Sequence, residues 1–379
     1  MPSNSELPPP MPPGVSRRDF ARFLSLTAAG LVIPRGSAEA LLARDALGEI
    51  PPASAIRLNS NENPLGPSRA ALEAIQRLGA EGGRYPWEAE SALCRRIAEF
   101  EGIPETCVEV FNGSSDPLNR AVLAFTGPGR PFVYGEPGYE AGRRAAKVSG
   151  AEAIAIALTD SLAHDAGAMC AANQTPGLLY ICSPNNPTGT TTTRDQILWA
   201  LANKPANSLL LVDEAYLHFS NERSVADQIA THADLLVLRT FSKLYGMAGL
   251  RMGLALAQPP VLDRLRAFGM SSTSAPGIAA ARASLDDAGL IATRRAYNAE
   301  AREATFAFLT QRGYTFHPSV SNCFMLDAER PAAELAKALR QRGVLIGRTW
   351  PVWPNYARIT IGTPEEMQQF CRALEAVRI

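Results

Sequence analysis

Residues 209–216 read LLLVDEAY and residues 235–243 read LLVLRTFSK. Each stretch begins with a run of apolar residues of strand length and then turns polar, so each predicts a buried strand followed by functional side chains. Asp213 and Lys243 stand at these two ends. Because the carboxyl ends of neighbouring parallel strands meet at one edge of a sheet, we expect an acid and an amine at the same edge.

Further apolar runs of the same kind occur on both sides, at residues 131–134, 153–158, 178–182 and 254–257. Stretches with helical spacing lie between several of them, as at residues 194–204 and 224–232. Continuous apolar strands that alternate with helices predict an α/β fold, in which helices sandwich a mostly parallel sheet.

The pattern changes after about residue 270. A long helical stretch, residues 275–312, is followed by short strands and helices that predict a smaller α+β domain. The predicted organisation is a signal segment, an N-terminal arm that belongs to the small domain, a large domain and the small C-terminal domain, at residues 1–40, 41–66, 67–270 and 271–379.

The composition excludes several classes of protein. The chain has 379 residues, 46% of them hydrophobic, with 37 basic and 37 acidic side chains. This composition is too apolar and too evenly charged for a disordered chain. It also lacks the excess of basic residues that a nucleic-acid-binding protein has. No apolar run reaches the roughly 18 residues of a membrane span, and the six Cys and four His show no ligand spacing for a metal site.

The N-terminus has the order of an export signal. Ser16-Arg17-Arg18-Asp19-Phe20 precedes an uncharged stretch at residues 23–34, and Ala38-Glu39-Ala40 follows. The order basic, apolar, small resembles a twin-arginine signal and predicts a periplasmic or otherwise exported protein. An unprocessed cytoplasmic tail is the alternative, since the chain holds other Arg-Arg pairs, for example Arg143-Arg144.

Lys243 is the strongest candidate for a reactive amine. It follows a buried strand, where partial desolvation lowers a lysine pKa and makes the amine nucleophilic. Thr240 and Ser242 supply hydroxyl groups and Arg251 a bidentate guanidinium, which together could hold a phosphate. The other three lysines, Lys147, Lys204 and Lys337, lack this context, although an ordinary surface lysine remains the alternative for Lys243.

Three further segments carry candidate ligand contacts. Asp213 is an acid at the end of a buried strand and needs a partner, either a structural arginine or a cationic ring nitrogen, and Tyr216 could bond the same ring. Residues 112–116 (NGSSD) precede a helical pattern and could bind an anion, or simply cap the helix. Residues 183–190 (SPNNPTGT) form a turn that could aim one amide at a ligand.

Taken together and in order, these motifs resemble fold-type I pyridoxal-phosphate aminotransferases of class I/II. The resemblance is greatest to the histidinol-phosphate aminotransferase branch and covers roughly residues 50–379. It rests on six motifs, at residues 58–67 (LNSNENPLGP), 84–86 (RYP), 186–189 (NPTG), 213–216 (DEAY), 242–251 (SKLYGMAGLR) and 357–363 (ARITIGT).

The resemblance implies pyridoxal 5'-phosphate as the cofactor. Lys243 would form the internal aldimine and move the proton between the substrate Cα and the cofactor. Asp213 would pair with the pyridine nitrogen, which keeps the ring an electron sink. Tyr216 and Asn186 would bond the phenolate oxygen of the ring, and Tyr139 would stack on its face.

The resemblance also implies the contacts at the two ends of the site. The phosphate would be held by Ser114, Ser115, Thr240, Ser242 and Arg251. Tyr85 would reach the phosphate of a neighbouring subunit, which implies a homodimer with shared active sites. Arg358 would grip the α-carboxylate of the substrate bidentately, helped by Asn322 and Arg348.

The implied reaction transfers an amino group from an L-amino acid, or a histidinol-phosphate-like amine, to a 2-oxo acid by a ping-pong route. A decarboxylase or lyase on the same scaffold is one alternative, and an exported small-molecule binding protein is another. Residues 270–275 depart from the histidinol-phosphate branch. Trp350, Trp353 and Tyr356 either line a substrate pocket or pack between domains.

Overall fold

The computed structural model describes residues 54–269 and 272–377. The predicted signal at residues 1–40, the first half of the predicted arm and the junction at residues 270–271 lie outside the described residues. The division into a large and a small domain therefore stays a prediction at its boundaries.

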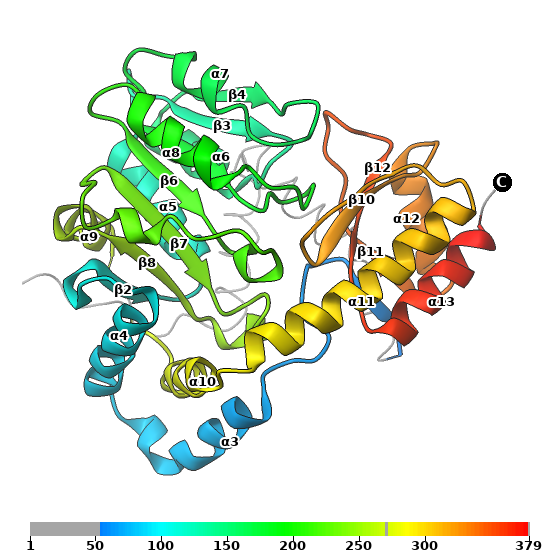
Figure 1. Ribbon diagram of the computed structural model, residues 1–379, viewed down its shortest axis with the longest axis horizontal. Helices are drawn as coiled ribbons and strands as arrows, with labels where there is room; N and C mark the ends of the chain where they lie inside the picture. Colours follow the sequence, from blue (N-terminus) through cyan, green and yellow to red (C-terminus); the bar gives the residue numbers. More distant parts are fainter. Residues whose placement is uncertain (1–53, 270–271, 378–379) are drawn as a thin grey trace, which may run out of the picture. The chain divides into compact units, whose positions relative to one another are not determined.

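The centre of the fold is a seven-stranded sheet with the strand order β2-β8-β7-β6-β5-β3-β4 (Figure 1). Only β8 runs antiparallel to its neighbours, so the sheet is mainly parallel and the predicted α/β class is confirmed. The strands are β2 (Val108–Phe111), β3 (Phe132–Glu136), β4 (Ala153–Ala157), β5 (Leu178–Cys182), β6 (Leu209–Asp213), β7 (Leu235–Thr240) and β8 (Gly253–Ala257).

Strands β5, β6 and β7 are buried along their whole length, which explains why their residues are almost all apolar. In β6, Leu210 and Val212 join one hydrophobic cluster, while Leu209 and Leu211 join the other. Helices α4 (Trp87–Glu101), α7 (Ala166–Ala171), α8 (Arg194–Asn203) and α10 (Ala275–Asp286) contribute to the first cluster. Helices α5 (Ser115–Phe125), α6 (Ala141–Ser149) and α9 (Pro259–Arg266) contribute to the second.

Two of the predicted helices are wrong in detail. Residues 224–232 form only a short 3-10 helix, Ala226–Gln228, because the Glu214 carboxylate accepts from the Ser224 hydroxyl and the Val225 amide and so competes with helical bonding. The stretch 275–312 is two helices, since α10 ends before Asp287 and α11 (Leu290–Gln311) begins after it. The Asp287 carboxylate accepts from the Gly289 amide and closes the turn between them.

A second set of elements comes mostly from the C-terminal part of the chain. Strand β10 (Cys323–Asp327) lies between β9 (Phe316–His317) and β12 (Tyr356–Thr360), all antiparallel. Strand β1 (Ile56–Leu58) pairs with β11 (Val344–Ile346), although nearly 300 residues separate them. Helices α11, α12 (Ala332–Arg340) and α13 (Pro364–Glu375) share a hydrophobic cluster with these strands, and α3 (Arg69–Leu78) packs against α10.

Side chains define where several helices begin. Thr193 and Gln196 form a reciprocal capping box at the start of α8, and Thr363 and Glu366 form another at α13. The Ser68 hydroxyl caps α3 by accepting from a backbone amide of the first turn. Because these caps are local in sequence, the helix starts follow from the residues themselves.

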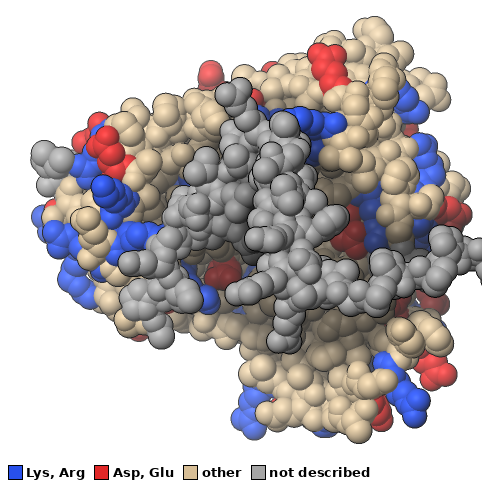
Figure 2. Space-filling view, turned by 180° about the vertical axis from the view of Figure 1, so that it is seen from behind, with Lys and Arg blue, Asp and Glu red and all other residues tan. Residues whose placement is uncertain are grey.

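The described surface carries both signs of charge. Figure 2 shows Lys and Arg side chains in several groups, with Asp and Glu side chains among them. Within residues 54–269 and 272–377, no helix has the length and apolar character to cross a bilayer. The same residues contain no group of three or more His, Cys, Asp or Glu side chains that could hold a metal ion.

Candidate functional site

The site lies at the carboxyl edge of β5, β6 and β7, which are neighbours in the sheet. Cys182 at the end of β5 pairs with Asp213 at the end of β6, and Asp213 pairs with Leu238 of β7. Lys243 follows three residues after the end of β7. The sheet register therefore brings together the ends of the two stretches that predicted the fold.

Asp213 is buried and held from two sides. Its Oδ2 accepts from the Tyr180 hydroxyl at 3.0 Å and its Oδ1 from the Ala215 amide at 3.1 Å. Burial nevertheless raises the pKa of this carboxyl to about 6, because the ionised form loses its hydration. A cation placed beside Asp213 would favour the ionised form. Tyr180 was not predicted, and its only signal is a hydroxyl within an apolar strand.

Lys243 is partly buried, and its amine donates to two successive backbone carbonyls. The Nζ atom lies 3.1 Å from the Asn61 oxygen and 3.3 Å from the Ser60 oxygen. Burial and the positive charge of Arg358 lower the pKa of Lys243 to about 8. The amine is thus close to equally protonated and neutral in mildly alkaline solution, as a nucleophile and proton carrier requires.

Asn61 links this amine to Tyr216. It is fully buried with a left-handed φ of 52°, which asparagine tolerates better than most residues. Its side-chain amide donates to the Tyr216 hydroxyl at 3.1 Å, and its backbone amide donates to the Thr360 hydroxyl at 2.9 Å. Asn61 lies in a motif that carried the family resemblance, but the sequence alone assigned it no role.

Arg358 enters the same region from β12. One terminal nitrogen donates to the Asn186 side-chain oxygen at 2.8 Å, and the other donates to the Asn59 backbone oxygen at 2.8 Å. Its Nε is buried and has no hydrogen-bond partner among the described residues. Asn322 donates to the backbone oxygens of Asn61 and Glu62, at 3.1 and 3.3 Å, so two of the three predicted carboxylate-binding residues, Arg358 and Asn322, bond one short segment.

The predicted phosphate site is assembled around Arg251. This residue has a left-handed φ of 54°, and its guanidinium donates to the backbone oxygens of Ala248 and Asn112. A Cβ added to Gly113 would lie 2.2 Å from an Arg251 nitrogen, so only glycine allows this approach. The Gly113 turn leads directly into α5, whose first amides favour an anion.

The remaining predicted phosphate ligands lie on two elements. Ser114 and Ser115 stand at the start of α5, and Thr240 and Ser242 stand at and beyond the end of β7. The Thr240 hydroxyl accepts from the Ser242 amide at 3.1 Å, which shapes the turn before Lys243. A guanidinium, hydroxyl groups and a helix N-terminus form a suitable donor set for a phosphate. These residues fit the phosphate group of pyridoxal 5'-phosphate.

Three predicted residues lie at the margins. The Tyr139 hydroxyl is 3.1 Å from the Ser115 hydroxyl, so Tyr139 lies beside the phosphate site. Arg348 forms an ion pair of 2.5 Å with Glu140, which is not one of the residues to which Arg358 donates. Tyr85 lies apart from the others: it is 71% exposed and stacks on Trp87, with ring centroids 5.3 Å apart.

The aromatic stretch divides into two groups. Trp350 is buried and its indole nitrogen donates to the Gly138 oxygen at 2.9 Å, beside Tyr139. Trp353 and Tyr356 instead pack against His317, with centroids 5.3 and 4.9 Å from its ring. Packing is therefore what the structure shows for all three rings, and only Trp350 lies next to predicted site residues.

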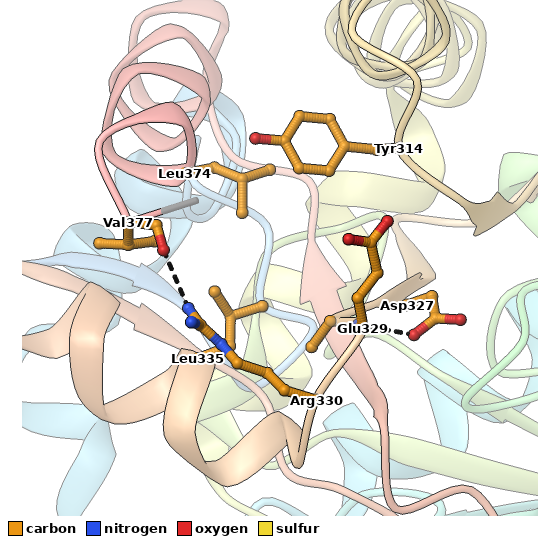
Figure 3. A pocket seen from close by; sticks show the side chains of 8 residues that line it. Tyr314, Asp327, Glu329, Arg330, Leu335, Leu374 and Val377 are labelled. Carbon is orange, nitrogen blue, oxygen red and sulfur yellow. Dashed lines mark hydrogen bonds between the residues drawn. The ribbon is translucent and has the colours of Figure 1, made fainter. Parts of the chain in front are cut away.

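A cavity of about 230 Å³ lies elsewhere, beside α12 and α13 (Figure 3). The Arg330 guanidinium donates to the Val377 backbone oxygen at 3.0 Å, and the Glu329 amide donates to Asp327 at 2.8 Å. None of the predicted site residues lines it. The lining side chains are those of Tyr314, Asp327, Ala328, Glu329, Arg330, Leu335, Leu374 and Val377.

Known proteins share both the sequence and the fold. The chain is 36% identical over 328 residues to the histidinol-phosphate aminotransferase of Symbiobacterium thermophilum, which covers 85% of this chain and 90% of that protein. It is 37% identical to histidinol-phosphate aminotransferase 2 of Pseudomonas aeruginosa over 86% of this chain and 90% of that protein.

A solved structure agrees with this fold. Histidinol-phosphate aminotransferase from Sinorhizobium meliloti, solved in complex with pyridoxal-5'-phosphate, superposes with a TM-score of 0.80 over 96% of this chain and 100% of that one. At 22% identity it shows the shared fold.

The model of the family "Aminotransferase class I and II" matches residues 53–374, a range that contains every predicted site residue. The amine at the edge of a mainly parallel sheet, the buried acid beside it and the phosphate cradle are what such a protein needs. The chain belongs to the aminotransferase class I and II family and is a pyridoxal-phosphate-dependent transaminase.

Proposed function

We propose that this transaminase takes its amino group from an L-α-amino acid whose carboxylate is bound by Arg358. The main support is that two cationic side chains, Arg358 and Lys243, donate to the same backbone segment, residues 59–61. Arg358 donates to the Asn59 carbonyl, and Lys243 donates to the Ser60 and Asn61 carbonyls. Arg358 and the Lys243 amine therefore both donate to one backbone segment of three residues, which supports their acting on the carboxylate and the Cα of the same substrate.

When bound, pyridoxal 5'-phosphate supplies an aldehyde carbon that accepts the amino group and a ring that withdraws electrons from the substrate Cα. Lys243 is the residue that attaches the cofactor and then carries a proton to and from Cα. Its pKa of about 8 allows both directions of transfer near neutral pH. Asp213, to which the Tyr180 hydroxyl donates, would provide the negative charge that pairs with a protonated ring nitrogen.

The other residues act by binding and orientation. Tyr216 and Asn186 would bond the ring oxygen, and Tyr139 would stack on the ring. Arg251 with the Gly113 turn would hold the phosphate, together with Ser114, Ser115, Thr240 and Ser242. Arg348, which is paired with Glu140, contributes positive charge near the substrate side, and Asn322 fixes the segment to which Lys243 and Arg358 donate.

The acceptor is a 2-oxo acid, and the two half-reactions follow each other in ping-pong order. A histidinol-phosphate-like amine is the second donor class, supported by the names of the relatives at 36% and 37% identity. The test is a visible absorption spectrum of the purified holoenzyme with a panel of L-amino acids and with histidinol phosphate. A cofactor band that disappears with one donor and returns with a 2-oxo acid identifies both half-reactions.

Two other outcomes would contradict the proposal. Carbon dioxide release without an oxo-acid product would indicate a decarboxylase on the same scaffold. No covalent cofactor after reconstitution would point to a small-molecule binding protein.

We also propose a homodimer in which Tyr85 serves the partner's site. The support is its exposure: Tyr85 and Trp87 are 71% and 72% exposed and stacked on each other, although large aromatic side chains are usually buried. Tyr85→Ala should weaken cofactor binding, and mixing it with Arg358→Leu chains should restore some active sites if the sites are shared. The absence of any recovery on mixing would contradict shared sites.

Finally, we propose that residues 1–40 direct export. The support is the order of Arg17-Arg18, the uncharged stretch 23–34 and Ala38-Glu39-Ala40. Cell fractionation should place the full chain in the exported fraction and the Arg17→Lys, Arg18→Lys double variant in the cytoplasm. Equal distribution of the two chains would favour the cytoplasmic tail.

A further inference from the structure

Residues 348–350 contact both Arg358, the proposed carboxylate-binding residue, and the turn that carries Tyr139. This turn comprises Pro137, Gly138, Tyr139 and Glu140 and follows directly after β3. Residues 348–350 come shortly after β11, on a different part of the chain. Three sets of contacts, made by Trp350 and Arg348, join the two segments or reach Arg358.

The first contact is a hydrogen bond from an indole to a backbone oxygen. Trp350 is only 1% exposed, and its Nε1 donates to the Gly138 oxygen at 2.9 Å. Because tryptophan has a single polar atom and a rigid ring, this one bond sets the direction of the whole side chain. The ring is therefore held against the turn that presents Tyr139.

The second contact is between the indole ring and two guanidinium groups. The Arg358 Cζ lies 5.6 Å from the Trp350 ring centroid, and the Arg348 Cζ lies 5.1 Å from it. Both distances are within the range of a cation–π attraction, which is strongest at buried sites such as that of Arg358. Trp350 thus contacts the Arg358 guanidinium in addition to the hydrogen bonds that this guanidinium donates to Asn186 and Asn59.

The third contact joins Arg348 to Glu140 at 2.5 Å. It lies next to Tyr139, whose hydroxyl is 3.1 Å from that of Ser115 at the phosphate cradle. The turn therefore contacts the predicted phosphate site through Tyr139 and Ser115. It also contacts Trp350 and Arg348, and Trp350 in turn contacts Arg358. A change in the Trp350 contact would move Arg358 relative to Tyr139.

We propose that Trp350 is a positioning residue for substrate recognition: it orients Arg358 relative to the Tyr139 turn and thereby sets the affinity for the substrate carboxylate. The inference rests on the proposed role of Arg358. It predicts a specific kinetic pattern, because Trp350 contacts neither Lys243 nor Asp213 in the contacts described above. Binding of carboxylate substrates should depend on Trp350, and proton transfer should not.

The test compares Trp350→Phe with Trp353→Phe in the holoenzyme. Trp353 is the matched control, since it lies three residues away and its ring packs against those of His317 and Tyr356. We expect Trp350→Phe to raise KM for the L-amino acid and for the 2-oxo acid by about 5- to 20-fold, with kcat within about twofold, since one buried hydrogen bond and part of a cation–π contact are lost. The visible spectrum of the cofactor should be unchanged.

A second substitution at position 350 tests the same inference if Trp350→Phe disturbs folding. Incorporation of β-(3-benzothienyl)alanine at position 350 keeps the shape of the ring and removes only the N–H donor. We expect a rise of KM in the same direction with unchanged thermal unfolding. Wild-type KM in both variants, or an equal fall of kcat for amines with and without a carboxylate, would overturn the inference.

The design separates this inference from the proposed function. If the wild-type holoenzyme shows no spectral response to any carboxylate donor, the proposed function fails. If the wild-type enzyme responds and the Trp350 variants match it, only the role of Trp350 fails.

Discussion

Lys243 donates a hydrogen bond from its side-chain amine to the backbone carbonyl of Asn61, over 3.1 Å. These residues are 182 positions apart in the chain, and Asn61 also donates to the Tyr216 hydroxyl at 3.1 Å. The segment before α3 therefore helps to place both the reactive amine and a predicted ring contact. Without this segment, the Lys243 amine and the Tyr216 hydroxyl would lose these hydrogen bonds.

Replacing Lys243 by Ala should reduce kcat by at least about 10³-fold, because the general acid–base group and the attachment point are both removed. Steady-state turnover with the donor found in the spectral panel measures the effect. Lys337→Ala is the control, since Lys337 lies exposed on α12. Near-wild-type turnover of a folded Lys243→Ala protein would contradict the assignment.

Replacing Arg358 by Leu should lower kcat/KM for α-carboxylate donors by roughly 30- to 1,000-fold. This corresponds to about 2–4 kcal/mol for the loss of a buried, charge-assisted pair. Amines that lack a carboxylate should be affected much less, and the ratio of the two specificities is the measurement. A uniform loss across both classes would indicate a structural role for Arg358.

The rate at which the apoprotein attaches pyridoxal 5'-phosphate should rise with pH around a midpoint of about 8 and level off above that midpoint, because the neutral Lys243 amine is the nucleophile. Stopped-flow absorption at a series of pH values gives the midpoint. Arg358→Leu should move the midpoint to higher pH, since the Arg358 charge is one cause of the lowered lysine pKa. A midpoint near 10 in the wild-type chain would show that Lys243 is not perturbed.

Asp213→Asn should stabilise the apoprotein in neutral solution while it weakens the holoenzyme. The folded-state pKa of Asp213 is raised to about 6, so its contribution to stability is greatest below the unfolded-state pKa of about 4 and declines as the pH rises through 6. The asparagine cannot ionise, so the variant should lack this decline, on the order of 2–3 kcal/mol between pH 4 and pH 8.

Chemical denaturation of wild-type and Asp213→Asn apoprotein at these two pH values measures the difference. The turnover of the reconstituted variant should fall because the ring nitrogen loses its anionic partner. If the two apoproteins show the same dependence of stability on pH, the carboxylate is not the source of the effect.

Gly113→Ala should weaken binding of the cofactor phosphate. A Cβ at this position would meet an Arg251 nitrogen at 2.2 Å, so the guanidinium has to move. Gly129→Ala is the matched control, because Gly129 has a similar φ of 74° against 80° but no atom within 4 Å of the added Cβ. Titration of the apoproteins with pyridoxal 5'-phosphate should show weaker binding only for Gly113→Ala, and equal weakening in both would indicate backbone strain alone.

The central sheet was predictable because its strands are buried on both faces. Leu209 to Val212 and Leu235 to Leu238 are apolar without a break, which is typical of strands in a parallel sheet that is covered on both sides. Helix starts such as Thr193 and Thr363 were also local signals. The irregular segment 224–232 was not predictable, because Glu214, ten residues earlier, takes its backbone and hydroxyl donors.

The residues of the site divide in the same way. The amino-acid types and their positions pointed to Lys243 and Asp213, since a lysine after a buried strand and an acid at a strand end carry chemical meaning by themselves. The role of Arg358 came only from the family resemblance. The sequence could not reveal that Tyr180 holds Asp213, or that Trp350 supports Arg358 from beside Gly138. These contacts join residues 33 and 212 positions apart.

The sequence by itself determined the layered α/β class, the reactive amine and the family resemblance, because apolar periodicity and short motifs act over a few neighbouring residues. Only the tertiary structure decided which side chains share the site with that amine. Long-range pairings such as β1 with β11 and Arg358 with Asn59 depend on how buried surfaces pack and how buried polar groups find partners. Those requirements are satisfied by the folded chain as a whole and leave no local pattern in the sequence.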